Sequence, residues 1–265
     1  MLMNKKVKIL HIDIETAPMQ CYTWSLFKPM IAIDNIVHDW YVLCWAAKWD
    51  NEPDVYFDAL WLNKGYKKDM RNDRDIVSTI WGMLNEADIV VGHNGKRFDV
   101  AKLNAKFFEF GFGPPKPFKV VDTLSVARAN FKLSSNKLDY ISKLRAFGSK
   151  LDTNFRLWLD VMAGDKKQCA RMLEYNIHDV ELLEDVYHDM LPWITNHPNV
   201  VLYSDTIVPA CAKCGSEDLK KDGTTKLAAG IYQQYKCKSC GGWVRGGHNL
   251  APLASRKNLL RNVAS

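Results

Sequence analysis

The stretch that decides the fold is residues 8–16, which read KILHIDIET. The apolar, β-branched residues here predict a buried strand over residues 7–14 that ends at acidic side chains. Asp13 and Glu15 stand two residues apart, so both side chains leave the same face of that strand. Such a pair can be ordinary surface, and its meaning depends on what the rest of the chain brings beside it.

A second acidic block lies in residues 91–99, VGHNGKRFD. A short strand is predicted over residues 88–91, and it breaks at Gly92. Asp99 then stands just inside a helix predicted over residues 98–110. A carboxylate at that position gains from the partial positive charge of the helix N-terminus and can point into a cleft.

The third block is residues 175–179, YNIHD, in a segment with helical character. Tyr175 and Asp179 are four residues apart and therefore share one helix face. Each block alone is unremarkable. Their order and separation predict that Asp13, Glu15, Asp99 and Asp179 converge on a single site.

The remaining pattern predicts strands before helices, which indicates a mixed α/β layer fold. Further strands are expected at residues 40–49, 54–59 and 119–121, and further helices at 73–87, 122–130, 136–147, 166–175 and 179–193, the last two separate or one kinked rod. Tryptophans concentrate near the second strand, and we interpret Trp24, Trp40, Trp45 and Trp49 as sheet core instead of a base-stacking platform.

The acidic set fits phosphodiester hydrolysis. This reaction needs an activated water and charge stabilisation on the attacking and leaving oxygens, which two divalent ions about 3.5–4 Å apart supply. Hard cations prefer oxygen ligands, so two Mg²⁺ or Mn²⁺ ions are the expected cofactors. Without a metal, four clustered carboxylates would repel one another and raise each other's pKa.

These blocks resemble motifs I, II and III of the DEDD superfamily of 3′→5′ exonucleases, which have a ribonuclease H-like fold. The resemblance covers about residues 7–190, roughly the length of one such domain. It is strongest to the proofreading domain of family B DNA polymerases and to stand-alone phage-type exonucleases. Further matches are residues 92–94 (GHN) before Phe98-Asp99, 122–124 (DTL) and 135–140 (SNKLDY).

The resemblance also implies roles for single residues. Asp13 would bridge both ions, Glu15 and Asp179 would hold the ion on the nucleophile side, and Asp99 would support the second ion through water. The tyrosine subclass has Tyr four residues before the last Asp, which matches Tyr175. The histidine subclass has His five residues before it, where this chain has glutamate, so Tyr175 and not His178 is assigned to orient the water.

The resemblance further implies that three residues contact substrate, namely Thr16, Asn94 and Lys137. The alternative interpretation is that Asn94 is a turn former and Lys137 a surface lysine. His11 shares the predicted face of Asp13, and we interpret it as a core histidine or one that supports the metal ligands.

Four of the seven cysteines form two tight pairs, Cys211-x-x-Cys214 and Cys237-x-x-Cys240. Four thiolates at this spacing predict one structural Zn²⁺ in a zinc ribbon, whose folding the metal would drive. An odd cysteine count also argues for a reducing compartment over a disulfide framework. Cys21, Cys44 and Cys169 are interpreted as small core residues.

The predicted organisation is an exonuclease domain at residues 1–194, a linker at 195–208, the ribbon at 209–245 and a flexible basic tail at 246–265. In the ribbon, basic residues alternate with aromatic ones, which indicates nucleic-acid binding. The alternative is that the aromatics form a small core and the lysines solvate it. The residues concerned are Lys213, Lys220, Lys221, Lys226, Tyr232, Tyr235, Lys236, Lys238, Trp243 and Arg245.

Together these features predict a hydrolase that removes nucleoside monophosphates from single-stranded ends, with DNA favoured over RNA. The alternatives are an exoribonuclease, a non-catalytic nucleic-acid-binding module, and a protein that the ribbon recruits to a polymerase or replication complex. A net charge of +6 and a pI near 8.8 suit a polyanionic partner. With no signal-peptide pattern or membrane-length apolar run, we expect a cytoplasmic protein, in the host cytoplasm if phage-encoded.

Overall fold

The computed structural model describes residues 6–27, 30–228 and 230–260. It divides into two compact units, Lys8–Tyr187 and a second unit of Met1–Val7 with His188–Ser265. The predictions for residues 1–5 and for the last five residues of the basic tail lie outside the described residues.

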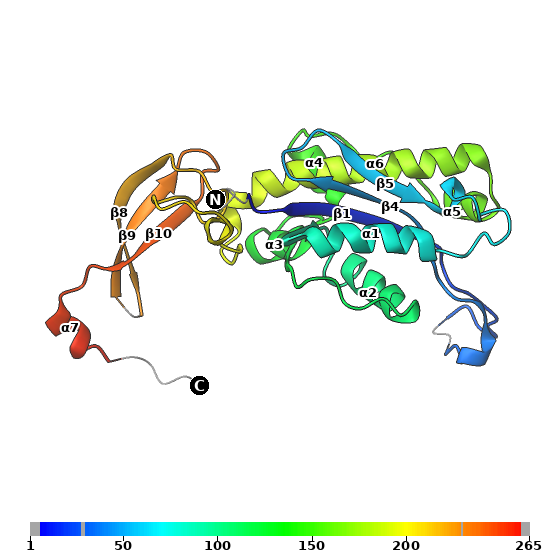
Figure 1. The fold of residues 1–265 in the computed structure, drawn as a ribbon, viewed down its shortest axis with the longest axis horizontal. Coiled ribbons are helices and arrows are strands. Elements are labelled where there is room, and N and C mark those ends of the chain that lie inside the picture. The colour runs from blue at the N-terminus through cyan, green and yellow to red at the C-terminus, as the bar shows by residue number, and fades with distance from the viewer. Residues whose placement is uncertain (1–5, 28–29, 229, 261–265) are drawn as a thin grey trace. The chain divides into compact units, whose positions relative to one another are not determined.

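The first unit is built on a five-stranded mixed sheet in the order β5-β4-β1-β6-β7. Its strands β1, β4 and β5 are labelled in Figure 1. Strand β1 pairs antiparallel with β4 and parallel with β6; β4 pairs antiparallel with β5, and β6 pairs parallel with β7. The strands are β1 (Ile9–Thr16), β4 (Val42–Trp49), β5 (Val55–Ala59), β6 (Ile89–Gly92) and β7 (Lys119–Asp122). The predicted mixed α/β fold with a ribonuclease H-like sheet is confirmed.

The central strand β1 is buried on both faces. Its side chains alternate between the two faces, so the apolar ones enter the core and the acidic ones lie on the other face. Leu10, Ile12 and Ile14 join the apolar core with side chains of α1 (Arg74–Glu86) and α2 (Asp99–Glu109). The residues between them face α6 (Lys166–Met190), where the rings of His11 and Tyr187 lie 5.1 Å apart. The period of two therefore directs the acidic residues of β1 toward α6.

Most predicted elements are present, with differences at their ends. The two helices expected near the end of the domain form the single helix α6, and α4 (Leu138–Leu144) is shorter than predicted. The structure adds a helix that the pattern did not reveal, α5 (Phe155–Met162). The other elements of this unit are α3 (Thr123–Asn130), the hairpin strands β2 (Gln20–Cys21) and β3 (Ile36–His38), and 3-10 turns at Ile33–Asn35 and Leu60–Leu62.

The interpretation of all four tryptophans as sheet core is wrong for Trp24. Trp45 is buried and its indole donates a hydrogen bond to the Ile76 carbonyl at 2.7 Å, while Trp40 and Trp49 pack against the core. Trp24 is fully exposed because it lies in the loop that connects β2 to β3, outside the main sheet.

The second unit contains a three-stranded antiparallel sheet, β10-β9-β8, with β9 in the centre. Its elements are β8 (Leu219–Leu227), β9 (Gly230–Cys237), β10 (Trp243–Asn249), α7 (Leu253–Lys257) and 3-10 turns at Leu191–Trp193 and Val200–Tyr203. Strand β10 continues to Asn249, past residue 245 where the ribbon was predicted to end, because Asn249 pairs with Tyr232 of β9 after a register shift. Cys44 and Cys169 are buried in the first unit, as predicted, whereas Cys21 is only half-buried.

None of the helices in the described part of the chain combines the length and apolar character needed to cross a lipid bilayer.

Candidate active site and cysteine cluster

Three carboxylates from distant parts of the sequence meet between β1 and α6. One carboxylate oxygen from each of Asp13, Glu15 and Asp179 lies within 4.8 Å of the other two. Asp13 and Glu15 share a face of β1, and Asp179 comes from the buried side of α6. The packing of this helix on this strand therefore creates an acidic cluster.

Asp99 borders the cluster from a third element. It is the first residue of α2, is 3% exposed, and its Oδ1 accepts a hydrogen bond from the backbone N–H of Ile14 at 3.0 Å. Burial and the charge of Asp13 raise the pKa of Asp99 well above its ordinary value. Asp99 is thus tied to β1 directly beside the two acidic residues of that strand.

A tight turn holds Asp99 in this place. A side chain on Gly92 would bring its Cβ within 2.8 Å of the Gly95 Cα, so the chain closes here only with glycine. Between them, Asn94 adopts φ +70, and its backbone N–H donates to Asp122 Oδ1 at 3.1 Å. Asn94 therefore acts as a turn former in this structure.

The cluster carries a large electrostatic penalty. Burial, followed by repulsion from Asp179, raises the pKa of Asp13 from 3.8 to about 7. Burial and the neighbouring Asp13 raise the pKa of Glu15 well above its ordinary value, and burial also raises the pKa of Asp179. Ionised carboxylates at this density need cations nearby.

One cation comes from Lys150, a residue that no motif of the sequence indicates. Its Nζ hydrogen-bonds Asp179 Oδ2 and lies 3.3 Å from the Tyr175 hydroxyl. Burial disfavours the ammonium, but attraction to Asp179 and Asp13 outweighs this and raises the pKa of Lys150. Lys150 lies in a loop after α4, where no periodicity or motif points to a site. One ammonium leaves most of the carboxylate charge uncompensated.

Tyr175 and Asn176 complete the wall that α6 presents to the cluster. Tyr175 is 9% exposed and packs edge-to-face on Trp158, and burial followed by the charge of Asp179 raises the pKa of its hydroxyl. The amide Nδ2 of Asn176 donates to Asp13 Oδ2 at 2.6 Å. Asn176, also missed from sequence, orients the Asp13 carboxylate.

His178 sits beside Asp179 in sequence but is directed elsewhere. Its Nε2 lies 2.9 Å from the carbonyl of Ser149, and its Nδ1 lies 3.6 Å from Glu181. It therefore contacts the loop that carries Lys150, and Tyr175 is the residue that reaches Lys150 and the acidic cluster.

A cavity of about 560 Å³ adjoins this site. Tyr175, Lys150, Lys137 and Arg128 line it together with Asp139, so three basic side chains outnumber one carboxylate around this space. His93 lines the same cavity, with ring nitrogens 2.9 Å from Thr123 Oγ1 and from the Asn136 carbonyl, and burial lowers its pKa to about 4. The walls suit an anionic ligand.

Other predicted residues lie around this region. Thr16 ends β1 at a register shift and is half-buried. His11 is fully buried, with Nε2 3.0 Å from Asp50 Oδ1, so it is a core histidine. The nearby Glu184 could form a metal-ligand group with these two residues, but the Lys48 ammonium lies 2.5 Å from it and already supplies the cation.

The acidic cluster fits a divalent metal by its chemistry. Asp179 Oδ1 is buried and forms no hydrogen bond within the described residues, although a buried carboxylate oxygen is costly to leave unpaired. The donor set around it is all oxygen, which Mg²⁺ and Mn²⁺ prefer over softer ligands.

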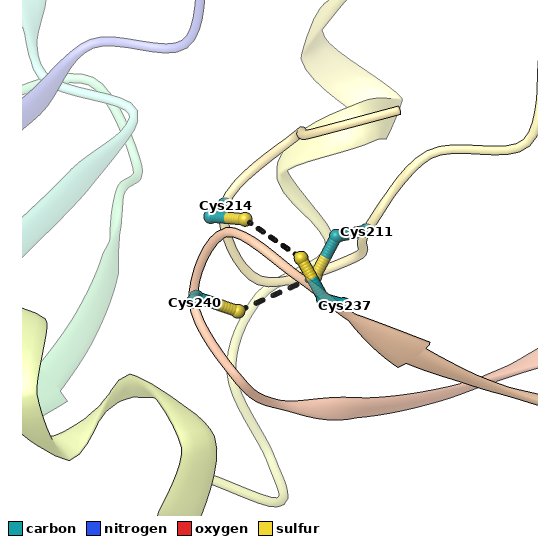
Figure 2. Close-up of side chains that lie close together, drawn as sticks. All are labelled: Cys211, Cys214, Cys237 and Cys240. Atoms are coloured by element: carbon teal, nitrogen blue, oxygen red, sulfur yellow. Dashed lines mark hydrogen bonds between the residues drawn. The ribbon is translucent and has the colours of Figure 1, made fainter. Parts of the chain in front are cut away.

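The second unit holds a cluster of four cysteines, shown in Figure 2. Cys211 Sγ lies 3.7 Å from Cys240 Sγ, and Cys214 Sγ lies 3.7 Å from Cys237 Sγ. These separations are too long for disulfides, and none of the seven cysteines, all of which are described, forms one. A tetrahedron with Zn–S bonds of about 2.3 Å has S···S edges of about 3.8 Å, which fits the cluster.

Similarity to a known protein family covers most of the first unit. Residues 55–191, slightly more than half of the chain, match the RNase_H_2 family, described as the RNase_H superfamily. The chain belongs to the RNase H superfamily. The matched segment contains Asp99, Tyr175 and Asp179, whereas Asp13 and Glu15 precede it and join the site through the pairing of β1 with β6 and its packing against α6.

Two relatives of this RNase H-superfamily chain come from Arabidopsis thaliana. Protein NEN1 is 31% identical over 104 residues, 37% of this chain and 21% of NEN1; Protein NEN4 is 29% identical over 104 residues, 37% of this chain and 39% of NEN4. The chain therefore matches well under half the length of either relative.

A solved structure shares the fold. The family B DNA polymerase of the archaeon Pyrobaculum calidifontis aligns with a TM-score of 0.51 and 17% identity, over 70% of this chain and 25% of the polymerase chain. At this level of identity the similarity is one of fold.

Proposed function

We propose that this chain is a metal-dependent 3′→5′ exonuclease of the tyrosine subclass of the DEDD superfamily. It would hydrolyse phosphodiester bonds at single-stranded ends, with DNA favoured over RNA, and release nucleoside monophosphates. The observation that carries the proposal is the meeting of Asp13, Glu15 and Asp179 within 4.8 Å, with Asp99 and Tyr175 alongside.

Metal binding is part of the proposal. Asp13, Glu15, Asp99 and Asp179 would hold two Mg²⁺ or Mn²⁺ ions. When bound, such ions polarise the scissile phosphate and lower the pKa of an attacking water. The unpaired Asp179 Oδ1 and the raised pKa values of all four carboxyls support this assignment, since a divalent cation would relieve both conditions.

The chain's own residues would position the reactants. Tyr175 would orient the attacking water through its hydroxyl, which its raised pKa keeps protonated near neutral pH and therefore able to donate a hydrogen bond. Lys150, 3.3 Å from that hydroxyl, would fix the phenol and balance charge next to the scissile phosphate. Asn176 would hold the Asp13 carboxylate toward the cluster.

Substrate contacts are proposed for the adjoining cavity. Lys137 would contact the terminal nucleotide from the cavity wall that it shares with Tyr175. Asn94 and Thr16 are proposed to line the path of the nucleic acid strand. The backbone N–H of Asn94 also donates a hydrogen bond to Asp122, so only its side chain is free to contact substrate. An exoribonuclease remains the alternative substrate choice, because the carboxylates serve either sugar.

The proposal is tested by incubating the full chain with single-stranded DNA and RNA of matched sequence, labelled at the 5′ or the 3′ end. Reactions contain Mg²⁺, Mn²⁺ or neither, and a circular single strand serves as the substrate without ends. We expect a 5′-labelled strand to shorten in steps, a 3′-labelled strand to lose its label at once, and the circle to stay intact. Asp13→Ala should reduce the rate by about 100-fold or more.

The matched control is Asp54→Ala, since Asp54 is exposed and lies outside the cluster. Cleavage of the circle, or a rate unaffected by Asp13→Ala, would refute the exonuclease. A non-catalytic binding module predicts binding without cleavage under every metal condition.

We propose that Cys211, Cys214, Cys237 and Cys240 bind one structural Zn²⁺ and form a zinc ribbon. The proposed organisation is a nuclease domain to residue 194, a linker at 195–208, the ribbon from residue 209 and a basic tail. A cytoplasmic location completes the proposal, and recruitment to a polymerase or replication complex is the alternative role of the ribbon. A pull-down with and without nuclease treatment would distinguish protein docking from tethering through nucleic acid.

A further inference from the structure

The basic excess of this protein lies in its C-terminal part. Residues 209–265 contain ten of the 36 lysines and arginines but three of the 30 acidic residues. The remainder of the chain is therefore close to neutral. A polyanion would be attracted to this part, and the question is which surface could receive it.

Strand register separates the side chains of the three-stranded sheet into two faces. Residues directly opposite each other on neighbouring strands share a face. Lys236 of β9 is opposite Trp243 of β10 and opposite Lys220 of β8, and Arg245 lies over the ring of Tyr232. We call these five residues, Lys220, Tyr232, Lys236, Trp243 and Arg245, the basic aromatic face.

The opposite face of the sheet turns toward its own unit. Tyr235 and Val244 line a cavity of about 660 Å³ there, together with residues of the preceding segment such as Ile207 and Pro209. Of the three aromatic residues of the ribbon, Tyr235 therefore belongs to the covered side. Tyr232 and Trp243 belong to the basic aromatic face, where Trp243 is 46% exposed.

Cations and rings alternate on the basic aromatic face. Lys236 Nζ lies 4.8 Å from the centroid of the Trp243 ring, and Arg245 Cζ lies 4.5 Å from the centroid of the Tyr232 ring. Within the described residues, neither cation forms an ion pair with a carboxylate. Two positive charges therefore remain available to an anion next to two flat apolar surfaces.

Lys220 and Lys236 form a like-charged pair. They are directly opposite on β8 and β9, an arrangement that destabilises a sheet when nothing lies between the charges. A phosphate between the two ammonium groups would convert this repulsion into attraction. An anion therefore gains from this position more than from a single surface lysine.

We propose that the basic aromatic face binds single-stranded nucleic acid, with bases stacked on Trp243 and Tyr232 and phosphates held by Lys220, Lys236 and Arg245. Exposed rings beside cations suit a single-stranded nucleic acid. Each base can stack on a ring through its π-face, and each phosphate of the backbone carries one negative charge that a cation can bind. The inference takes from the proposed function only the class of ligand. It adds a binding surface on the unit that does not contain the carboxylate cluster.

The test measures affinity for a fluorescent single-stranded DNA over a range of salt concentrations. It uses the zinc-loaded full chain carrying Asp13→Asn, without Mg²⁺ or Mn²⁺, so that the strand is not cut. The variant Lys220→Gln with Lys236→Gln is compared with Lys221→Gln plus Lys226→Gln. The second pair removes the same charge from β8 on the opposite face.

We expect the first pair to reduce the slope of log K against log salt by about 1.4, which is about 0.7 for each lost phosphate contact. The control pair should leave the slope near that of the parent. Trp243→Ala should weaken binding by about 5- to 150-fold, as expected for one stacking ring, and Trp243→Phe should recover most of this loss. Bound zinc in each variant shows that the ribbon is intact.

Equal effects of the two lysine pairs would overturn the inference, because they would show that only overall charge matters. Unchanged affinity in all of these variants would also overturn it and would favour a protein partner for this face. Cleavage that survives Asp13→Asn refutes the proposed exonuclease chemistry but leaves this binding test valid. The two proposals can therefore fail separately.

Discussion

Replacing Asp13 by asparagine is expected to stabilise the metal-free protein above neutral pH. The Asp13 carboxyl has its pKa raised from 3.8 to about 7 by burial and by Asp179. At about 1.4 kcal/mol per pH unit, keeping it ionised in the folded state costs at most about 4 kcal/mol. Asp13 is only half-buried, so solvent screening reduces the expected gain from Asp13→Asn to about 2–3 kcal/mol.

The sign of the pH dependence follows from proton uptake. Between pH 3.8 and about 7 the folded protein holds a proton on Asp13 that the unfolded chain releases. Stability therefore falls as the pH rises through this window, and the loss is complete above it. Because asparagine resembles the protonated acid and can still accept the hydrogen bond from Asn176, the variant should match the parent at low pH and exceed it at high pH.

The assay is urea unfolding followed by tryptophan fluorescence, with zinc bound and no other divalent ion present. Seven of the nine tryptophans lie within Lys8–Tyr187, so the signal reports mainly on the unit that contains Asp13. Asp54→Asn is the matched control because Asp54 is exposed, and it should show little change.

Mg²⁺ should offset the stability advantage of the variant. Binding to the folded parent adds about 2.7 kcal/mol when Mg²⁺ is at about 100 times its dissociation constant, and the variant should gain much less. A variant less stable than the parent without divalent ions at about pH 8, or a difference that does not grow across the window, would refute the electrostatic reasoning.

Three further predictions concern other groups. Tyr175→Phe should reduce turnover by about 100-fold while leaving Mg²⁺ affinity in calorimetry unchanged, and undiminished turnover would contradict the assignment of Tyr175. Lys150→Met should destabilise the metal-free protein by about 2–3 kcal/mol, less than for a fully buried pair because Lys150 is 25% exposed, and should increase the stabilisation by Mg²⁺. A smaller stabilisation would contradict this view of Asp179 and its partner. Cys214→Ser should lower zinc content and remove amide protection from β8, β9 and β10, and a matching loss within Lys8–Tyr187 would show that the units do not fold separately.

Local periodicity determined much of the fold. The alternation of residues 8–16 specified a buried strand with Asp13 and Glu15 on one face, and the structure has this arrangement. The four-residue spacing of Tyr175 and Asp179 on one helix, and the start of a helix at Asp99, were readable in the same way. Each of these features depends on residues within a few positions of one another.

Other features had no local signal. Lys150 lies in a loop, where neither spacing nor composition distinguishes it from other lysines of the chain. In the sequence, nothing distinguishes Asn176 from other polar helix residues, and only the folded structure brings its amide to Asp13. Strands β2 and β3 contain two and three residues, too few to show alternation, so the sequence wrongly predicts that Trp24 between them lies in the core.

The sequence by itself determined which side chains share a face within one strand or helix, because the geometry of each element repeats over a few residues. Only the tertiary structure decided that β1 and α6 pack together, which joins Asp13 to Asp179 across more than 160 residues of chain and brings Lys150 between them. In the ribbon, the sequence shows that basic and aromatic residues are present, and only the strand register determines which of them share a surface. Such contacts depend on the packing of whole elements, which no spacing within a short window encodes.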